Sequence, residues 1–339
     1  MSAPLVRSLR AMASTVTMTV VEPGPGAAAA LDRAELVVRQ VERTCSRFDA
    51  ASDLSRVNAA PDAWHDVPAT LALVVAEAGR AHERTAGLFD PRVLDALLTW
   101  GYDAGLAFGA DGPVRGEDRG RPGGVEPRTA PWRPVVDRDG ERYRLHLDGS
   151  AVDLGGIGKG LAVRWAAECL QVAGAGAMVD AGGDLAVRGR APDGERWLVG
   201  VEDPEGGGTS GVGGEGEQPL LVLGLRDAAC ATSSTRRRRW RAGGGEVVHH
   251  LVDPRTGRPG GAGLRAVTVV GPDLAWAEVW AKALFLVGVD AVAEQAAARG
   301  LAALWVGVDG VVGTTDALAD LVVWRRGVTL RSHDSEEAR

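Results

Sequence analysis

The sequence predicts an α+β fold in which a largely antiparallel sheet is flanked by helices. Strand-like segments come in hairpin-like pairs, and in residues 177–189 two such segments meet at a Gly–Gly pair. Helical segments stand between these pairs, which favours an antiparallel sheet over a doubly wound parallel one. The length of 339 residues allows two average domains or one large domain with a substantial core.

The N-terminal part of the chain is predicted to begin with one strand and to continue through helices. Alternating apolar residues from Val16 to Val20 indicate the strand, and apolar residues further on recur at helical spacing. Asp90 precedes Pro91, which is typical of a helix start in which the Asp is the cap. The expected elements are a strand at 16–20, a turn at 22–26, an amphipathic helix at 27–43, a short helix capped by Ser52 and Asp53, and a helix at 68–85 that ends at Gly87.

The C-terminal part is predicted to alternate strands and helices. Residues 103–134 and 205–218 are rich in glycine and polar residues and are expected to be mobile insertions, and residues 331–339 to be a disordered tail. The expected elements are a hairpin of 143–149 with 150–154, a helix at 161–174, the strand pair within 177–189, strands at 197–204, 220–225 and 264–271, helices at 275–288 and 289–300, and strands at 301–310 and 321–324.

The segment DLGGIGKG, Asp153 to Gly160, is predicted to connect an apolar strand-like run ending at Val152 to a helix that begins near Leu161. Its glycines let the backbone approach a ligand, and the free N–H groups of the helix start favour an anion such as phosphate. It is not a P-loop, because Gly160 follows Lys159, nor a dinucleotide fingerprint, because Leu161 stands in place of the third glycine. Taken alone, the motif fits a structural corner as well as a phosphate cradle.

Composition excludes several classes of function. The net charge of −7 argues against a general nucleic-acid binder, because no overall positive field recruits a polyanion. No apolar run approaches about 20 residues, so no membrane span is expected. The N-terminus has no apolar run of signal-peptide length. The cysteines Cys45, Cys169 and Cys230 form no CxxC pair and indicate reduced thiols, so we expect a cytoplasmic protein.

Six segments form an ordered set along the chain. They are FDPRVLDALLTWGY, DLGGIGKG, DAGGDLAVRG, WLVGVEDP, CATSSTRRRRW and HLVDPRTG. In this order and at these spacings they resemble the ApbE family of FAD:protein FMN transferases. The N-terminal segments RAMASTVTMTV and CSRFDAASDLSRVN are similar to that family's opening strand and its S-R-aromatic-D segment. The resemblance therefore covers nearly the whole chain.

The resemblance implies a single T-fold-like domain over residues 1–330 that binds FAD and magnesium. Members of the family cleave the FAD pyrophosphate, release AMP and leave FMN on a threonine or serine hydroxyl of an acceptor flavoprotein through a phosphoester bond. By the resemblance, the metal is held by the carbonyl of Gly156 and by side chains of the late helix, where Glu278 stands. The flavin-contacting positions correspond to Met12, Phe48, Leu88, Phe89, Asp90, Asp153, Lys159 and Leu251.

His250 is the best candidate for the base that takes the proton of the acceptor hydroxyl. Asp253, three residues further on, is either the orienter of His250 or a residue of the turn that Gly257 marks. His249 is expected to be structural. Of the arginines at 236–239, one or two are expected to face the phosphates or an acidic acceptor surface, with the others in water.

The chain departs from the family's pattern in the late helix, where an Asp and, one turn later, a Thr are the usual metal ligands. Glu278 and Lys282 stand there instead. Glu278 can offer a carboxylate oxygen to magnesium, whereas Lys282 cannot coordinate a cation. Lys282 can pair with Glu278 at i,i+4 spacing, or its ammonium can take over part of the metal's charge at the pyrophosphate. The alternative to a transferase is a non-catalytic FAD-binding or carrier protein that has lost the metal-dependent step.

Overall fold

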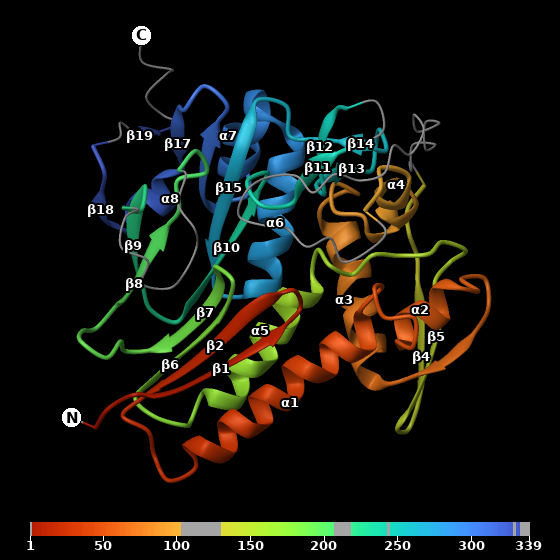
Figure 1. Ribbon diagram of the computed structural model, residues 1–339, viewed down its shortest axis with the longest axis horizontal. Coiled ribbons are helices and arrows are strands. Elements are labelled where there is room, and N and C mark those ends of the chain that lie inside the picture. Colours follow the sequence, from red (N-terminus) through yellow and green to blue (C-terminus); the bar gives the residue numbers. More distant parts are fainter. Residues whose placement is uncertain (1, 103–129, 207–217, 243–244, 328–329, 333–339) are drawn as a thin grey trace.

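The computed structural model describes residues 2–102, 130–206, 218–242, 245–327 and 330–332, and its centre is a nine-stranded sheet (Figure 1). The strand order is β1-β2-β6-β7-β10-β15-β16-β17-β19, antiparallel throughout except for the parallel pair of β17 and β19. The predicted α+β fold with a largely antiparallel sheet is thereby confirmed. The strands are β1 Leu5–Ala11, β2 Ser14–Val21, β6 Gly176–Ala181, β7 Asp184–Gly189, β10 Ala228–Ser234, β15 Leu264–Gly271, β16 Ala302–Gly307, β17 Val312–Thr314 and β19 Leu330–Ser332.

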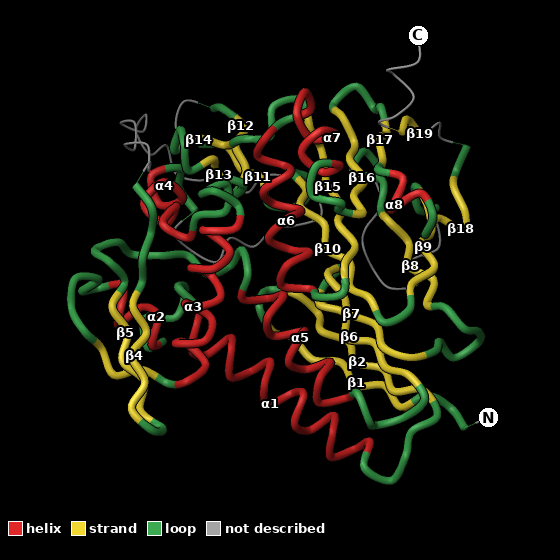
Figure 2. Tube along the Cα trace, turned by 180° about the vertical axis from the view of Figure 1, so that it is seen from behind, coloured by secondary structure: helices red, strands yellow, loops and turns green. Residues whose placement is uncertain are grey.

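Helices α1, α5 and α6 cover one face of this sheet (Figure 2). α6 packs on β10 and β15, α5 packs on β6 and β7 and against α6, and α1 packs on α5. Val16, Met18 and Val20 of β2 are fully buried in this core, which confirms the predicted alternation. The helices are α1 Ala27–Cys45, α5 Gly158–Leu170, α6 Leu274–Val287 and α7 Val289–Ala297.

A second sheet, of order β18-β9-β8, packs on the other face of the central sheet. Successive residues of a strand point to opposite faces. Accordingly, Ala229 and Ala231 of β10 belong to the core under the helices, and Cys230 between them belongs to the core shared with the second sheet. The elements here are β8 Trp197–Val201, β9 Leu221–Leu225, β18 Val322–Arg325 and the short helix α8 Asp316–Ala319.

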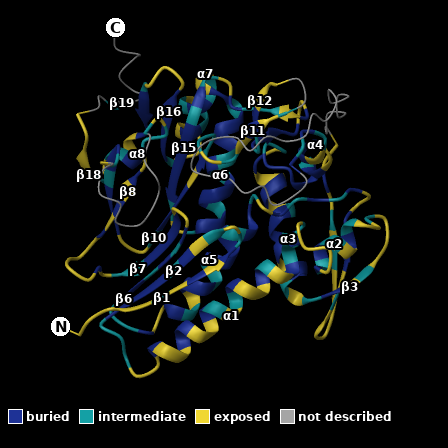
Figure 3. Ribbon diagram, in the orientation of Figure 1, coloured by how far each residue is buried: buried dark blue, intermediate teal, exposed yellow. Residues whose placement is uncertain are grey.

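A lobe built from α2, α3 and the sheet β3-β5-β4 lies beside α1, α5 and α6 (Figures 1 and 3). Its core includes Leu71 and Leu145 and is continuous with Leu161 of α5 and Val279 of α6, so the lobe and the main body share packing. The remaining elements are α2 Asp53–Asn58, β3 His65–Val67, α3 Ala69–Arg84, the 3-10 turn η1 Pro91–Val93, α4 Leu94–Thr99, β4 Val135–Asp139, β5 Arg142–His146, β11 Arg239–Arg241, β12 Val247–His249, β13 Val252–Asp253 and β14 Arg258–Pro259. Within the described ranges, no helix combines the length and the apolar character needed to cross a membrane.

The expectation of a single N-terminal strand was wrong, because β1 precedes β2 and pairs with it from Leu5 opposite Val20 to Ala11 opposite Ser14. The two-residue connection consists of Met12 and Ala13, both with positive φ. Such turns usually carry Gly or Asn. The hairpin therefore lacks the turn signal that would have revealed it.

The predicted hairpin of 143–149 with 150–154 was also wrong. β5 lies between β3 and β4 and pairs with both, so neither of its edges pairs with residues 150–154. Residues around Val152 are not in a sheet, since the Asn58 side chain takes the place of a neighbouring strand. Its Nδ2 donates to the Val152 carbonyl at 2.8 Å, and its Oδ1 accepts from the Val152 N–H at 2.9 Å. The following helix begins at Gly158, three residues before the predicted start at Leu161.

Several predicted boundaries are confirmed or corrected. The Ser52 side chain caps α2, and the Asp90 side chain accepts from the N–H of Arg92 at the start of η1, as expected. The predicted tail begins too early, because residues 331–332 belong to β19. Most of the predicted insertions, at 103–129 and 207–217, lie outside the described residues, whereas Trp132 near the end of the first is buried in the core of the lobe.

Candidate functional site

The glycine turn is held between the lobe and α6. The Asp153 carboxylate accepts from the N–H of Gly155 at 2.7 Å, and its own N–H donates to the Pro91 carbonyl at 2.7 Å. A Cβ on Gly156 would stand 2.9 Å from the ring of Phe89 and 2.9 Å from Cε of Lys282. Only glycine fits between these two side chains without a shift, so the turn backbone is pinned in place.

The first turn of α5 rests on Glu278. One oxygen of this buried carboxylate accepts from the N–H of Gly160 at 2.8 Å. A Cβ on Gly160 would lie 2.7 Å from Cα of Ala275, so α5 and α6 approach each other here more closely than any other residue would allow. Glu278 thus satisfies one of the free N–H groups of the helix start and complements its positive dipole end.

Lys159 lies in the same turn of α5 and forms an ion pair with Asp184, the first residue of β7. The second oxygen of Asp184 accepts from the N–H of Thr232 at 2.9 Å, which fixes the carboxylate. Burial lowers the pKa of Lys159 to about 8, against the opposing effect of the Glu278 carboxylate. Burial also raises the pKa of Asp180, which precedes the Gly–Gly turn between β6 and β7.

An aromatic group stands beside Asp153. Arg47 forms an ion pair with Asp153 and donates from Nη2 to the Tyr102 carbonyl at 2.8 Å. Its guanidinium lies 4.0 Å from the ring centroid of Phe48, and the Phe48 and Tyr102 rings meet edge-on at 5.6 Å. Phe48 is nevertheless 47% exposed. An exposed ring held in place next to the glycine turn offers a stacking surface for a planar ligand.

His250 follows β12 and is anchored to Arg238. Its N–H donates to the Arg238 carbonyl at 3.3 Å, and its Nδ1 lies 3.3 Å from the same oxygen. Burial, together with the charges of Arg238 and Lys282, holds the pKa of His250 well below its usual value. The imidazole is therefore neutral at physiological pH and can accept a proton.

His249 has a structural setting, as expected. Its Nδ1 accepts from the N–H of Leu251 at 3.3 Å, and its ring meets Phe285 edge-on at 5.9 Å. Burial lowers its pKa to about 4. Leu251 itself is 1% exposed and belongs to the core under the helices.

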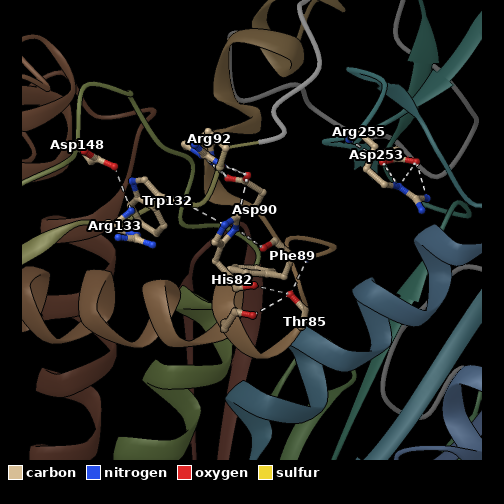
Figure 4. Close-up of polar contacts among 12 residues, drawn as sticks. His82, Thr85, Phe89, Asp90, Arg92, Trp132, Arg133, Asp148, Asp253 and Arg255 are labelled. Atoms are coloured by element: carbon tan, nitrogen blue, oxygen red, sulfur yellow. Dashed lines mark hydrogen bonds and ion pairs between the residues drawn. The ribbon is translucent and has the colours of Figure 1, made fainter.

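The sequence left two roles open for Asp253, orienter of His250 or residue of the turn, and its contacts are those of a turn residue (Figure 4). Its carboxylate accepts from the N–H of Arg255 at 2.8 Å and pairs with the same guanidinium, and its carbonyl accepts from the N–H of Gly257 at 2.8 Å. No hydrogen bond joins Asp253 to His250 in the described part of the chain, and the observed contacts give no support to the orienter interpretation.

The remaining predicted flavin contacts lie in three different settings. Asp90 is buried between Arg92 and His82, with its carboxylate 2.7 Å from Nη2 of Arg92 and 3.5 Å from Nδ1 of His82 (Figure 4). Leu88 is half-buried in the loop before Phe89, whose ring contacts the glycine turn. Met12 lies in the β1–β2 turn, where its N–H donates to Glu42 at 2.6 Å.

Sequence reasoning missed Arg47, Tyr102, Asp184 and Arg238 as individual site residues. Arg47, Tyr102 and Asp184 lie within segments already singled out, which was their only signal: the S-R-aromatic-D segment, FDPRVLDALLTWGY and DAGGDLAVRG. Arg238 is the arginine of the basic run whose charge acts on both Lys159 and His250. Its neighbour Arg237 pairs instead with Glu202 on the surface, at 2.8 Å.

A magnesium ion does not fit the donors beside the glycine turn. Magnesium requires a near-octahedral set of oxygen ligands. One oxygen of Glu278 already accepts from Gly160, the Asp153 carboxylate is engaged by Arg47 and Gly155, and the stem of Lys282 lies against Gly156. Among the described residues, no group of three or more His, Cys, Asp or Glu side chains is arranged to hold a metal ion.

Comparison with known sequences gives one family. The sequence model of the ApbE family matches residues 12–305. The FAD:protein FMN transferase of Haemophilus influenzae is 29% identical over 278 residues, which are 79% of this chain and 75% of that protein. The protein of the same name from Salmonella typhimurium is 27% identical over 249 residues, which are 72% of this chain and 67% of that protein.

Comparison with solved structures gives the same fold. The ApbE protein from Thermotoga maritima superposes with a TM-score of 0.74 at 22% identity, over 94% of this chain and 99% of that one. The apo form of the flavinyl transferase ApbE from Pseudomonas stutzeri superposes with a TM-score of 0.71 at 24% identity, over 94% of this chain and 98% of that one.

Proposed function

The chain belongs to the ApbE family, and on that premise we propose that it is a flavin transferase. It cleaves FAD, attaches FMN through a phosphoester bond to a threonine or serine hydroxyl of an acceptor flavoprotein, and releases AMP. The observation that carries the proposal is that the same two cations, Arg238 and Lys282, act both on Lys159 of the glycine turn and on the neutral imidazole of His250. A glycine turn at a helix start favours an anion, and a neutral imidazole can accept a proton.

The residues divide the work between binding and proton transfer. The pyrophosphate is bound by the backbone N–H groups of Gly156 and Lys159 and by the Lys159 ammonium, since most of the other N–H groups of the turn already have acceptors, while Phe48 offers its exposed ring to the flavin. His250 takes the proton of the acceptor hydroxyl. The hydroxyl oxygen forms a bond to the phosphorus of the FMN half, the bond from that phosphorus to the AMP phosphate oxygen breaks, and AMP leaves with that oxygen.

We assign the flavin side of the site to five residues that act by their position and not by their charge: Met12, Leu88, Phe89, Asp90 and Leu251. Of these, Phe89 has the most support, because its ring contacts the glycine turn at Gly156. The Asp90 carboxylate is neutralised by Arg92, so we assign it the task of holding the loop that carries Phe89.

The proposed setting is the cytoplasm, with a soluble acceptor flavoprotein as partner. Cys45, Cys169 and Cys230 are all free thiols, which suits a reducing compartment. The resemblance also implies magnesium at Gly156 and Glu278, but the donors there do not fit this ion. None of the proposed steps therefore involves a metal.

The test is a reaction of this protein with FAD and purified flavoproteins from the same organism, each carrying a surface threonine or serine segment. We expect AMP in solution and flavin fluorescence that stays with one acceptor after denaturation. The same mixture with acceptors whose Thr or Ser is replaced by Ala is the control. FAD that stays bound and intact with every acceptor would contradict transfer and favour the carrier protein.

A further inference from the structure

Lysine is rare in this chain and occurs only in the glycine turn and on the helix beside it. Of the 38 lysine and arginine residues, only Lys159 and Lys282 are lysines. The arginine side chain ends in a planar guanidinium group with five N–H donors, whereas lysine ends in a compact ammonium on a flexible stem. In a chain that otherwise uses arginine for every basic position, both compact cations stand at one site, Lys159 within α5 and Lys282 on α6.

The stem of Lys282 lies directly on the turn. Its Cε and Cδ would stand 2.9 and 3.5 Å from a Cβ placed on Gly156, on the same position that the Phe89 ring approaches from the lobe. The side chain is half-buried and leaves α6 one turn after Glu278. This contact directs the stem across the glycine backbone, at the position where the family resemblance implies a metal ion.

The ammonium of Lys282 has charges around it but no partner within the described part of the chain. Glu278 and Asp153 attract it, and Arg238 repels it. Neither carboxylate forms an ion pair or a hydrogen bond with it, because Asp153 is engaged by Arg47 and Glu278 accepts from Gly160. The N–H donors of Lys282 are therefore available to a ligand beside the turn.

A divalent cation is disfavoured at this position for the same reason. The ammonium of Lys282 and the charge of Arg238 already lie beside the turn, in addition to Lys159, which is paired with Asp184. Like charges repel strongly where water is excluded, and an ammonium supplies no lone pair to a metal. The ammonium of Lys282, unpaired among the described residues, thus complements a negative charge of a pyrophosphate without an added ion.

We propose that the ammonium of Lys282 replaces the divalent cation, so that this protein binds and cleaves FAD without a metal ion. The inference rests on the proposed function and deepens it. Lys282 neutralises the charge that develops on the AMP phosphate oxygen as its bond to the FMN phosphorus breaks. The proton of the acceptor hydroxyl still passes to His250, and Lys282 remains protonated throughout.

The first test measures FAD affinity by quenching of flavin fluorescence, in EDTA and in magnesium chloride. We expect the wild-type dissociation constant to be the same in both. Lys282→Met is expected to raise it about tenfold or more in both, because one charge-assisted contact is lost. Lys282→Thr, which exchanges the ammonium for a hydroxyl oxygen, is expected to be as weak in EDTA and to recover partly with magnesium.

Thermal unfolding distinguishes a structural role of Lys282 from a role in binding FAD. Because Lys282 has no ion-pair partner among the described residues, Lys282→Met is expected to leave the thermal unfolding midpoint unchanged or raise it. In EDTA, FAD should also protect Lys282 from acetylation, which mass spectrometry can assign because Lys159 is the only other lysine. Manganese alone, followed by electron paramagnetic resonance, should show no specific site in the wild type.

Three results would overturn the inference: wild-type affinity for FAD that falls tenfold or more in EDTA, a specific manganese site in the wild type, or Lys282→Met with unchanged affinity. Failure of the proposed function looks different. FAD that binds without metal but never yields AMP removes transfer and the part of Lys282 in cleavage, and leaves only the role of Lys282 in binding intact. No FAD binding under either condition removes both.

Discussion

The Glu278 carboxylate on α6 accepts a hydrogen bond from the N–H of Gly160 on α5 at 2.8 Å. This contact ties the helix that carries Lys282 to the helix that starts at the glycine turn. Since a Cβ on Gly160 would also meet Cα of Ala275 at 2.7 Å, the two helices can approach this closely only over a glycine. The second glycine of GKG is therefore required for helix packing, besides any part it has in binding.

Gly160→Ala should lower the free energy of unfolding by about 1–3 kcal/mol, because the added methyl overpacks against backbone that cannot move without shifting α6. Gly158→Ala in the same helical turn is the matched control, since its Cβ would meet nothing within 4 Å. That control should stay within about 1 kcal/mol of wild type or become more stable. Urea unfolding measures both. Equal losses in the two variants would show that helix contact is not what selects Gly160.

Phe48→Ala should weaken FAD binding about fivefold to tenfold without loss of stability, because the exposed ring contributes stacking of about 1 kcal/mol. Trp64→Ala is the control: this ring is 44% exposed and lies 5.0 Å from the Arg144 guanidinium, but it belongs to the lobe surface. Fluorescence titration with FAD compares the two. If both variants bind FAD like the wild type, the flavin does not stack on Phe48.

His250→Gln should lower the rate of transfer by about 10²- to 10⁴-fold, because no base remains to take the hydroxyl proton. Its FAD affinity should stay within about twofold of wild type. His65→Gln, on β3 in the lobe, serves as the control. Since the pKa of His250 is well below its usual value, wild-type activity should persist on the acid side of about pH 6.5. A loss of activity as the pH falls through the ordinary histidine pKa would contradict the assignment of His250 as the base.

FAD affinity should fall as the pH rises from about 7 to about 9. Lys159 is charged below its pKa of about 8 and loses its proton above it, while the pyrophosphate keeps its negative charges. The dissociation constant should therefore rise by at most about tenfold per pH unit above pH 8. Lys159→Met should bind more weakly at pH 7 and show a flatter profile. A flat wild-type profile would mean that Lys159 does not bind the pyrophosphate.

The sequence alone determined those features that depend on neighbouring residues. The alternation in β2, the cap at Asp90 and the turn at Asp253 follow from hydrogen bonds and side-chain directions within a few residues. The fold class follows from the same local patterns, because hairpins between helices leave few ways to bury their apolar faces. The glycine turn was identified by its composition, although not its role in helix packing.

Only the tertiary structure decided which distant residues meet. Asn58 occupies the place of a strand beside Val152, although 94 residues separate them, and Arg47 reaches Asp153 across 106 residues. Such pairs depend on how whole elements pack, and no local pattern encodes them. The same holds for Lys282: its position in the sequence shows only a departure from the family's pattern, whereas the structure places its stem against Gly156 of the glycine turn.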